Sequence, residues 1–203
     1  PVLINNQVQI QVVDFHKELH IETTMCSINI YNWPSKNRTW RNALDVQRKY
    51  DEKVPPIISG ELYNASRYFN TEKFIVVTEV GIVSSMDIGE RNTLGSSDTK
   101  FDNNNGIQKL TVTGSLPGFY YDPCKIDIYM DLNGMVEAPK ISITGIKGHD
   151  GRSYTRDNPM VVRNFASPGR METVFDSLSI RASYVDIQMQ NLRISNFSIT
   201  SST

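Results

Sequence analysis

The most chemically suggestive cluster lies near the amino terminus, where His16 and His20 flank Glu18 in the run His-Lys-Glu-Leu-His. On a helix the two imidazoles would lie about 6 Å apart along the axis and could share a zinc ion. In zinc hydrolases, however, the glutamate directly follows the first histidine or directly precedes the second. On a strand the two histidines would lie about 13 Å apart. We therefore expect exposed histidines and no metal site.

Acidic and amide side chains gather in a second segment, residues 98–106, which has the oxygen ligands that calcium prefers. If the calcium loop began at Asp102, its glycine position would fall on Ile107 and its bidentate acid position on Thr113. Neither residue type suits its position. The segment therefore predicts a polar turn.

The sequence contains no nucleophile motif: it has neither a Gly-x-Ser-x-Gly elbow nor a P-loop. Ser97 and Lys100 have the spacing of Ser-Lys acyl enzymes but lack the companion Lys-Thr-Gly element. A pair of facing carboxylates, as in glycosidases, would leave no sequence signature. We expect a protein that is not an enzyme and that uses no cofactor.

Aromatic and basic side chains form the remaining concentration of functional residue types. Trp, Tyr and Arg are enriched in interface hot spots, and they also stack on sugars and bases. The alternative is structural, with the tryptophans closing the edge of a core and the basic residues solvated. The candidates for a subunit interface or for ligand stacking are Tyr31, Trp33, Trp40, Tyr50, Tyr120, Tyr121, Arg152, Arg156, Arg163 and Arg170.

Composition limits the partners and the compartment. The net charge of −1 supplies no overall field for nucleic acid or for an anionic membrane, so contacts with other subunits or with a glycan fit better. No run approaches the roughly 20 apolar residues that span a bilayer, and the amino terminus does not resemble a signal peptide. We expect synthesis in the cytoplasm, with two free thiols at Cys26 and Cys124, and a protein that can become part of an extracellular particle.

Alternation of apolar and polar residues is the main structural signal. The clearest example is the stretch 125–132, and the following Asn133-Gly134 favours a hairpin that returns through Val136, Ile141 and Ile143. The run 74–83 is nearly all apolar and β-branched, which predicts a strand at the centre of a sheet. In the stretch 178–200 the alternation changes phase three times, which predicts bulges or tight turns.

Other stretches lack this alternation. Residues 39–50 fit either a short helix or a strand, while residues 33–59, 84–106 and 145–168 resemble long insertions. The predicted fold is a mainly β, antiparallel two-sheet sandwich of jelly-roll or immunoglobulin-like topology. It forms one domain over residues 1–203; the alternative is two small β modules, 1–83 and 107–203.

The absence of a catalytic motif, together with a β core and long loops, favours a structural assembly subunit. Such a protein would form homo-oligomers in the manner of virion or phage-tail and neck components, with loops and termini contacting neighbouring subunits. The alternative is a carbohydrate- or receptor-binding β-sandwich module that uses Trp33, Trp40 and residues 119–121 as a stacking platform.

Overall fold

The regular structure in the described part of the chain is β-strand. The computed structural model describes residues 2–14, 18–24, 26–32, 73–85, 92–93, 96–104, 107–115, 124–131, 138–147, 151, 153–165 and 173–201. The strands are β1 (Val2–Asp14), β2 (Glu18–Thr23), β3 (Ser27–Asn32), β4 (Lys73–Ser85), β5 (Asn92–Thr93), β6 (Ser96–Asn104), β7 (Ile107–Ser115), β8 (Cys124–Met130), β9 (Lys140–Gly145), β10 (Met160–Phe165), β11 (Thr173–Ala182), β12 (Val185–Gln188) and β13 (Leu192–Ser201). The possible helix at 39–50 lies outside these ranges, and no described helix is long and apolar enough to cross a membrane.

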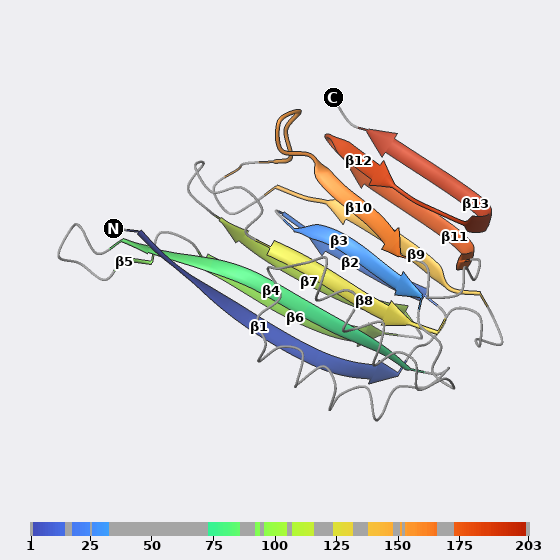
Figure 1. Ribbon diagram of the computed structural model, residues 1–203, viewed down its shortest axis with the longest axis horizontal. Helices are drawn as coiled ribbons and strands as arrows, with labels where there is room; N and C mark the ends of the chain where they lie inside the picture. Colours follow the sequence, from blue (N-terminus) through green and yellow to red (C-terminus); the bar gives the residue numbers. More distant parts are fainter. Residues whose placement is uncertain are drawn as a thin grey trace.

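The strands form two sheets (Figure 1). The first sheet has the order β1-β4-β8-β3-β10-β12, with β5 beside β4, and the second has the order β13-β11-β9-β2-β7-β6. The prediction of a mainly β protein with two sheets is therefore confirmed. The predicted antiparallel pairing is corrected, because three of the six described pairs in the first sheet and four of the five in the second are parallel. Antiparallel pairs occur only at β1–β4, β4–β5, β4–β8 and β6–β7 among the described strands.

Parallel pairing arises because the chain repeatedly crosses from one sheet to the other. After β2 in the second sheet, only residues 24–26 precede β3 in the first. The chain then goes from β7 to β8, from β9 to β10, and from β11 through β12 to β13 in the same alternating way. In Figure 1 the arrows of β3, β8 and β10 point one way and those of β7, β11 and β13 the other. The neighbours β8, β3 and β10 of the first sheet therefore run in the same direction, and so do β11 and β13 of the second.

Strands from both halves of the sequence pair with one another. From the first half, β2 lies between β7 and β9, and β3 lies between β8 and β10. Later strands of the chain therefore lie on both sides of β2 in the second sheet and on both sides of β3 in the first. Around β2 and β3, strands from the first and second halves of the sequence belong to the same sheets.

The parallel register stacks apolar side chains of the second sheet in rows that face the core. Two of these rows are named here after their residues in β13, as the Phe197 row and the Ile199 row. The Phe197 row contains Leu19, Ile141, Leu178 and Phe197. The Ile199 row contains Ile21, Ile143, Ile180 and Ile199. Ile28, Ile126 and Val162 of the first sheet belong to the same buried core, so the two sheets share it.

The strand predicted over 125–132 is confirmed as β8, but the predicted hairpin after it is wrong. β8 pairs with β3 and β4 in the first sheet, whereas β9, which carries Ile141 and Ile143, pairs with β2 and β11 in the second. Residues 133–134 and Val136 lie outside the described ranges. An Asn-Gly dipeptide favours a tight turn, but it does not determine which strand the chain meets next.

The strand predicted over 74–83 is confirmed as β4, which lies between β1 and β8. Its consecutive residues 74–78 are all buried, as expected for a strand covered on both faces. It is the second strand from the edge rather than the central one.

Two of the three predicted insertions contain strands. Within 84–106, β6 forms a hairpin with β7 in which Asn104 faces Ile107, so only two residues join the paired positions. Within 145–168, β10 alternates in burial through Met160 and Val162. These strands were missed because polar residues dominate β6 and because the apolar alternation in β10 is short. The insertion 33–59 lies outside the described ranges.

The phase changes predicted near the carboxyl terminus are confirmed. The first two coincide with the short connections 183–184 and 189–191, where the chain changes sheets. At the third, the register passes from Phe175 opposite Ile194 to Leu178 opposite Phe197. Both strands change phase at the same level, so their core-facing rows stay aligned.

Candidate functional site

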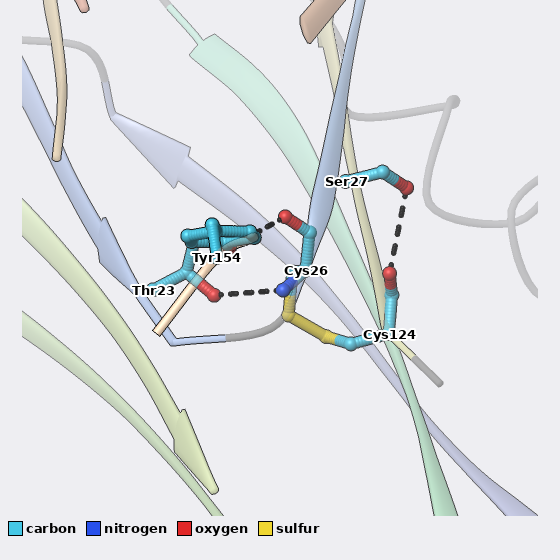
Figure 2. Close-up of a disulfide and its surroundings, with 5 residues drawn as sticks. All are labelled: Thr23, Cys26, Ser27, Cys124 and Tyr154. Carbon is cyan, nitrogen blue, oxygen red and sulfur yellow. Dashed lines mark hydrogen bonds between the residues drawn. A yellow bond between two sulfur atoms is a disulfide. The ribbon is translucent and has the colours of Figure 1, made fainter. Parts of the chain in front are cut away.

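Two parts of the molecule concentrate unusual features: a locked turn around Cys26 and an open end at β13. At the locked turn, a disulfide joins Cys26 to Cys124 (Figure 2). Ser27 lies opposite Lys125 in the parallel β3–β8 pair, so the preceding residues, the two cysteines, meet. The expectation of free thiols is therefore wrong. No sequence signal marked this pairing, because 98 residues separate the cysteines.

Tyr154 closes the locked turn from the loop before β10. Its hydroxyl donates a hydrogen bond to the carbonyl oxygen of Cys26 at 2.9 Å, and the Cys26 amide donates to Oγ1 of Thr23 at 3.2 Å (Figure 2). Burial raises the pKa of the Tyr154 hydroxyl well above its ordinary value, although its hydrogen bonds to Thr23 and Cys26 act in the opposite direction. The phenol therefore stays neutral and remains a donor.

Gly145 makes room for the Tyr154 ring. A Cβ atom at Gly145 would lie 2.8 Å from Cβ of Ala182 and 2.9 Å from the ring of Tyr154. Two further hydrogen bonds extend from this loop to the end of the sheet. Oγ of Ser183 donates to the Tyr154 carbonyl oxygen at 2.8 Å, and Oγ of Ser201 donates to the Ser183 carbonyl oxygen at 2.8 Å. The carboxyl end of β13 is thereby attached to the same rim as the locked turn.

The open end consists of β13, the last strand of the second sheet. It extends one strand further than β12, which is the last strand of the first sheet. β13 pairs with β11 on one side and with no described strand on the other. Leu178 and Ile180 in β11 are 0% exposed, whereas their neighbours in the same rows, Phe197 and Ile199, are 49% and 47% exposed. The side chains that would form the next core layer are therefore half open to solvent.

A fixed turn holds β13 in place. The amide side chain of buried Asn164 donates to the Gln190 carbonyl oxygen at 2.8 Å and accepts from the Gln190 amide at 2.7 Å. Asn191 has a φ of 48°, a left-handed conformation that asparagine tolerates better than most residues. The Asn191 carbonyl oxygen accepts a hydrogen bond from the amide of Thr173 at 2.8 Å. The exposed strand is thus anchored at its start as well as at its end.

Most of β13, from residue 194 to residue 201, has neither the charged residues nor the proline that often protect an edge strand. Natural edges are commonly blocked by charged residues, proline or bulges. In β13 the only charged residue is Arg193, and residues 194–201 are uncharged and contain no proline. The strand can therefore accept another strand without burying a charge.

The aromatic candidates are only partly within the described ranges. Tyr31 stacks between Tyr129 and Phe165, with ring centroids 4.6 and 4.7 Å apart and interplanar angles of 11° and 13°. The parallel register explains the row, since Tyr31 lies opposite both residues. Tyr31 and Tyr129 are buried, and Phe165 is 38% exposed. Of the three rings in this row, only that of Phe165 is exposed to solvent.

Two of the basic candidates are also described. Arg163 lies on β10, and its Nε donates to Oε1 of Gln188 at 3.0 Å. In register it lies opposite Asn29, two positions from the Tyr31–Phe165 pair. Arg156 is exposed on the loop before β10. The candidates outside the described ranges are Trp33, Trp40, Tyr50, Tyr120, Tyr121, Arg152 and Arg170.

The described residues offer no cluster for a metal ion: no three His, Cys, Asp or Glu side chains come together in these ranges. Nε2 of His20 lies 2.8 Å from Oε1 of Glu18, two residues earlier on β2. His16 lies outside the described ranges.

Phe197 and Ile199 were not among the residues singled out from the sequence. Their alternation identified them as core-facing, and the register does place them beside the buried Leu178 and Ile180. The available signal was the combination of this alternation with an uncharged stretch at the end of the strand. Exposure depends on the missing neighbour, which alternation does not report.

No family model and no curated protein matches the chain. Among solved structures, the chain aligns with a protein from Clostridium sporogenes that is named provisionally as a cell adhesion protein. The identity is 8% and the TM-score 0.32, over 96% of this chain and 100% of the other. A TM-score this low carries no argument about fold or function.

Proposed function

We propose that this protein is a non-enzymatic structural subunit of an assembly and that the open end at β13 is a joint with a neighbouring subunit. The observation that carries the proposal is the half exposure of Phe197 and Ile199 on an edge strand whose residues 194–201 are uncharged. A strand edge presents unpaired amide and carbonyl groups that can pair with another chain. The class includes virion and phage-tail components, the kind of protein that the sequence favours.

The anchoring of β13 supports this role. A strand that must accept a partner binds more tightly if it is already ordered, because less conformational entropy is lost on association. The hydrogen bonds of Asn164 to Gln190 and of Ser201 to Ser183 fix the two ends of the strand. The open end is therefore a preorganised surface.

The Cys26–Cys124 disulfide is consistent with a particle that functions in an oxidising medium. Structural disulfides persist in extracellular environments and are rare in the reducing cytosol. The disulfide therefore favours a protein that is part of an extracellular particle.

A carbohydrate- or receptor-binding module remains the alternative function. It requires exposed, coplanar aromatic rings. Of its stacking candidates, only Tyr31 is described, and Tyr31 is buried between two other rings. The described residues therefore support the structural role better.

Light scattering on the purified chain over a wide range of concentration tests the proposed function. We expect species larger than one 23.0 kDa chain, and we expect Ile199→Lys to remove them because the lysine would be buried in the joint. Thr200→Lys is the matched control, since Thr200 lies on the opposite face of the same strand. A protein that stays monomeric at every concentration would contradict the proposal.

A further inference from the structure

The end of the two-sheet stack is staggered. β11 leads through residues 183–184 to β12, the last strand of the first sheet, while β13 extends the second sheet by one more strand. Phe197 and Ile199 therefore face a position, next to β12, that no described strand occupies. A partner that completes the stack must supply a strand beside β12 and an apolar surface opposite β13.

We infer that the partner is a second copy of this chain, bound end to end so that its β13 lies beside β12 and opposite the first β13. This inference rests on the proposed function and names the partner at the same joint. The twofold axis runs parallel to β13. Each copy then places its extra strand in the position that the other copy leaves open, which is an isologous contact.

The strand is suited to pack on itself in this geometry. A twofold axis parallel to β13 brings like-numbered residues to the same level, so Phe197 faces Phe197 and Ile199 faces Ile199 of the other copy. Facing sheets lie about 10 Å apart, a distance that large apolar side chains fill. No charge is buried, because residues 194–201 are neutral and Arg193 lies on the opposite face from Leu192 and Ile194, which pack against the core.

Direct edge-to-edge pairing of the two β13 strands is the competing arrangement. It would bring the unpaired edges together, but the second sheet would then extend two strands beyond each β12. Phe197 and Ile199 of both copies would remain uncovered on their core-facing side. The end-to-end geometry is favoured because it covers these side chains.

Cross-linking with single introduced cysteines distinguishes the two arrangements. The chain has two cysteines, and both are consumed by the buried disulfide, so an introduced thiol is the only free one. In the full chain, Phe197→Cys is treated with a bifunctional thiol reagent that spans about 10 Å, the separation of facing sheets. Ile199→Cys is treated in the same way. Each variant replaces one of the two apolar side chains at the joint and keeps the other.

We expect most of the Phe197→Cys or Ile199→Cys protein to become covalent dimer, whereas the control Ser198→Cys, on the opposite face, should stay monomeric under denaturing conditions. Efficient direct disulfide formation by Ser198→Cys would indicate edge-to-edge pairing and overturn the inference. If none of the three variants is cross-linked while light scattering still shows assembly, the inference fails and the proposed function stands. A chain that is monomeric throughout overturns both.

Discussion

The middle of the stack and its open end are built from the same rows of side chains but differ in burial. In the Ile199 row, Ile143 and Ile180 are 0% exposed, whereas Ile199 is 47% exposed. The three residues have the same side chain and occupy equivalent register positions on neighbouring parallel strands. Only the number of neighbours differs.

This difference shows what stabilises the fold. A side chain in a parallel stack is covered by the strands on either side and by the facing sheet. Strands in the middle have all three, and the locked turn adds a disulfide and a hydrogen-bonded tyrosine there. β13 has a neighbour on one side only. Substitutions in the middle and at the open end should therefore differ in their effect on stability.

Removal of the disulfide should have the largest effect. The bond closes a loop of 98 residues between β3 and β8. In the chain-entropy model, a loop of this length corresponds to a loss of about 4 to 5 kcal/mol of stability. We expect the double variant Cys26→Ser/Cys124→Ser to show this loss in denaturant unfolding. An unfolding free energy equal to that of the unchanged protein would mean that the middle does not depend on the locked turn.

Truncation within the Ile199 row compares the two regions directly. Ile180→Ala should lose about 2–5 kcal/mol, because it leaves a cavity in a fully packed core. Ile199→Ala should lose about 1 kcal/mol or less in the monomer, because roughly half of that side chain is already exposed. Urea unfolding at low protein concentration gives both values. Equal losses would show that the open end is packed as well as the middle.

Loss of the Tyr154 hydroxyl should have a smaller effect. Tyr154→Phe leaves the Cys26 carbonyl oxygen without this donor, at a cost of about 1–3 kcal/mol. Chemical denaturation at neutral pH measures it, and Tyr184→Phe, at an exposed tyrosine, is the control. An unchanged unfolding free energy would show that the turn does not need this bond.

The same variant should change the pH dependence of stability. Because burial raises the pKa of Tyr154 in the folded protein above the unfolded value of 10.0, the unfolded chain releases this proton first as the pH rises. The contribution of Tyr154 is constant below pH 10 and decreases above it. Tyr154→Phe should lose less stability than the unchanged protein between pH 9 and 11. Identical slopes would contradict the assigned burial of the phenol.

The two Asn-Gly dipeptides illustrate the limits of sequence reasoning. Asn133-Gly134 predicted a hairpin, yet the strands on either side of it belong to different sheets. Asn105-Gly106 was assigned to a polar turn, and the strands on either side of it pair with each other. The local preference for a tight turn is the same in both cases. Which strands pair depends on where the rest of the chain lies.

The candidate site was less predictable than the fold. Alternation placed Phe197 and Ile199 on the core-facing side of a strand, and this is correct. The residue types that usually mark interfaces directed attention to aromatic and basic clusters instead, of which Tyr31 is buried. No local pattern showed that β13 ends its sheet or that Cys26 meets Cys124.

Local alternation predicted strands such as β8 and β4, because a two-residue period or an apolar β-branched run specifies an extended segment, but it did not reveal β6 or β10. It also determined the phase changes near residues 183 and 190, where the chain leaves one sheet for the other. The parallel pairing of most neighbouring strands, the disulfide between the two cysteines and the extra strand at the open end are visible in the tertiary structure alone. These features depend on contacts between residues far apart in the chain, which local periodicity does not encode.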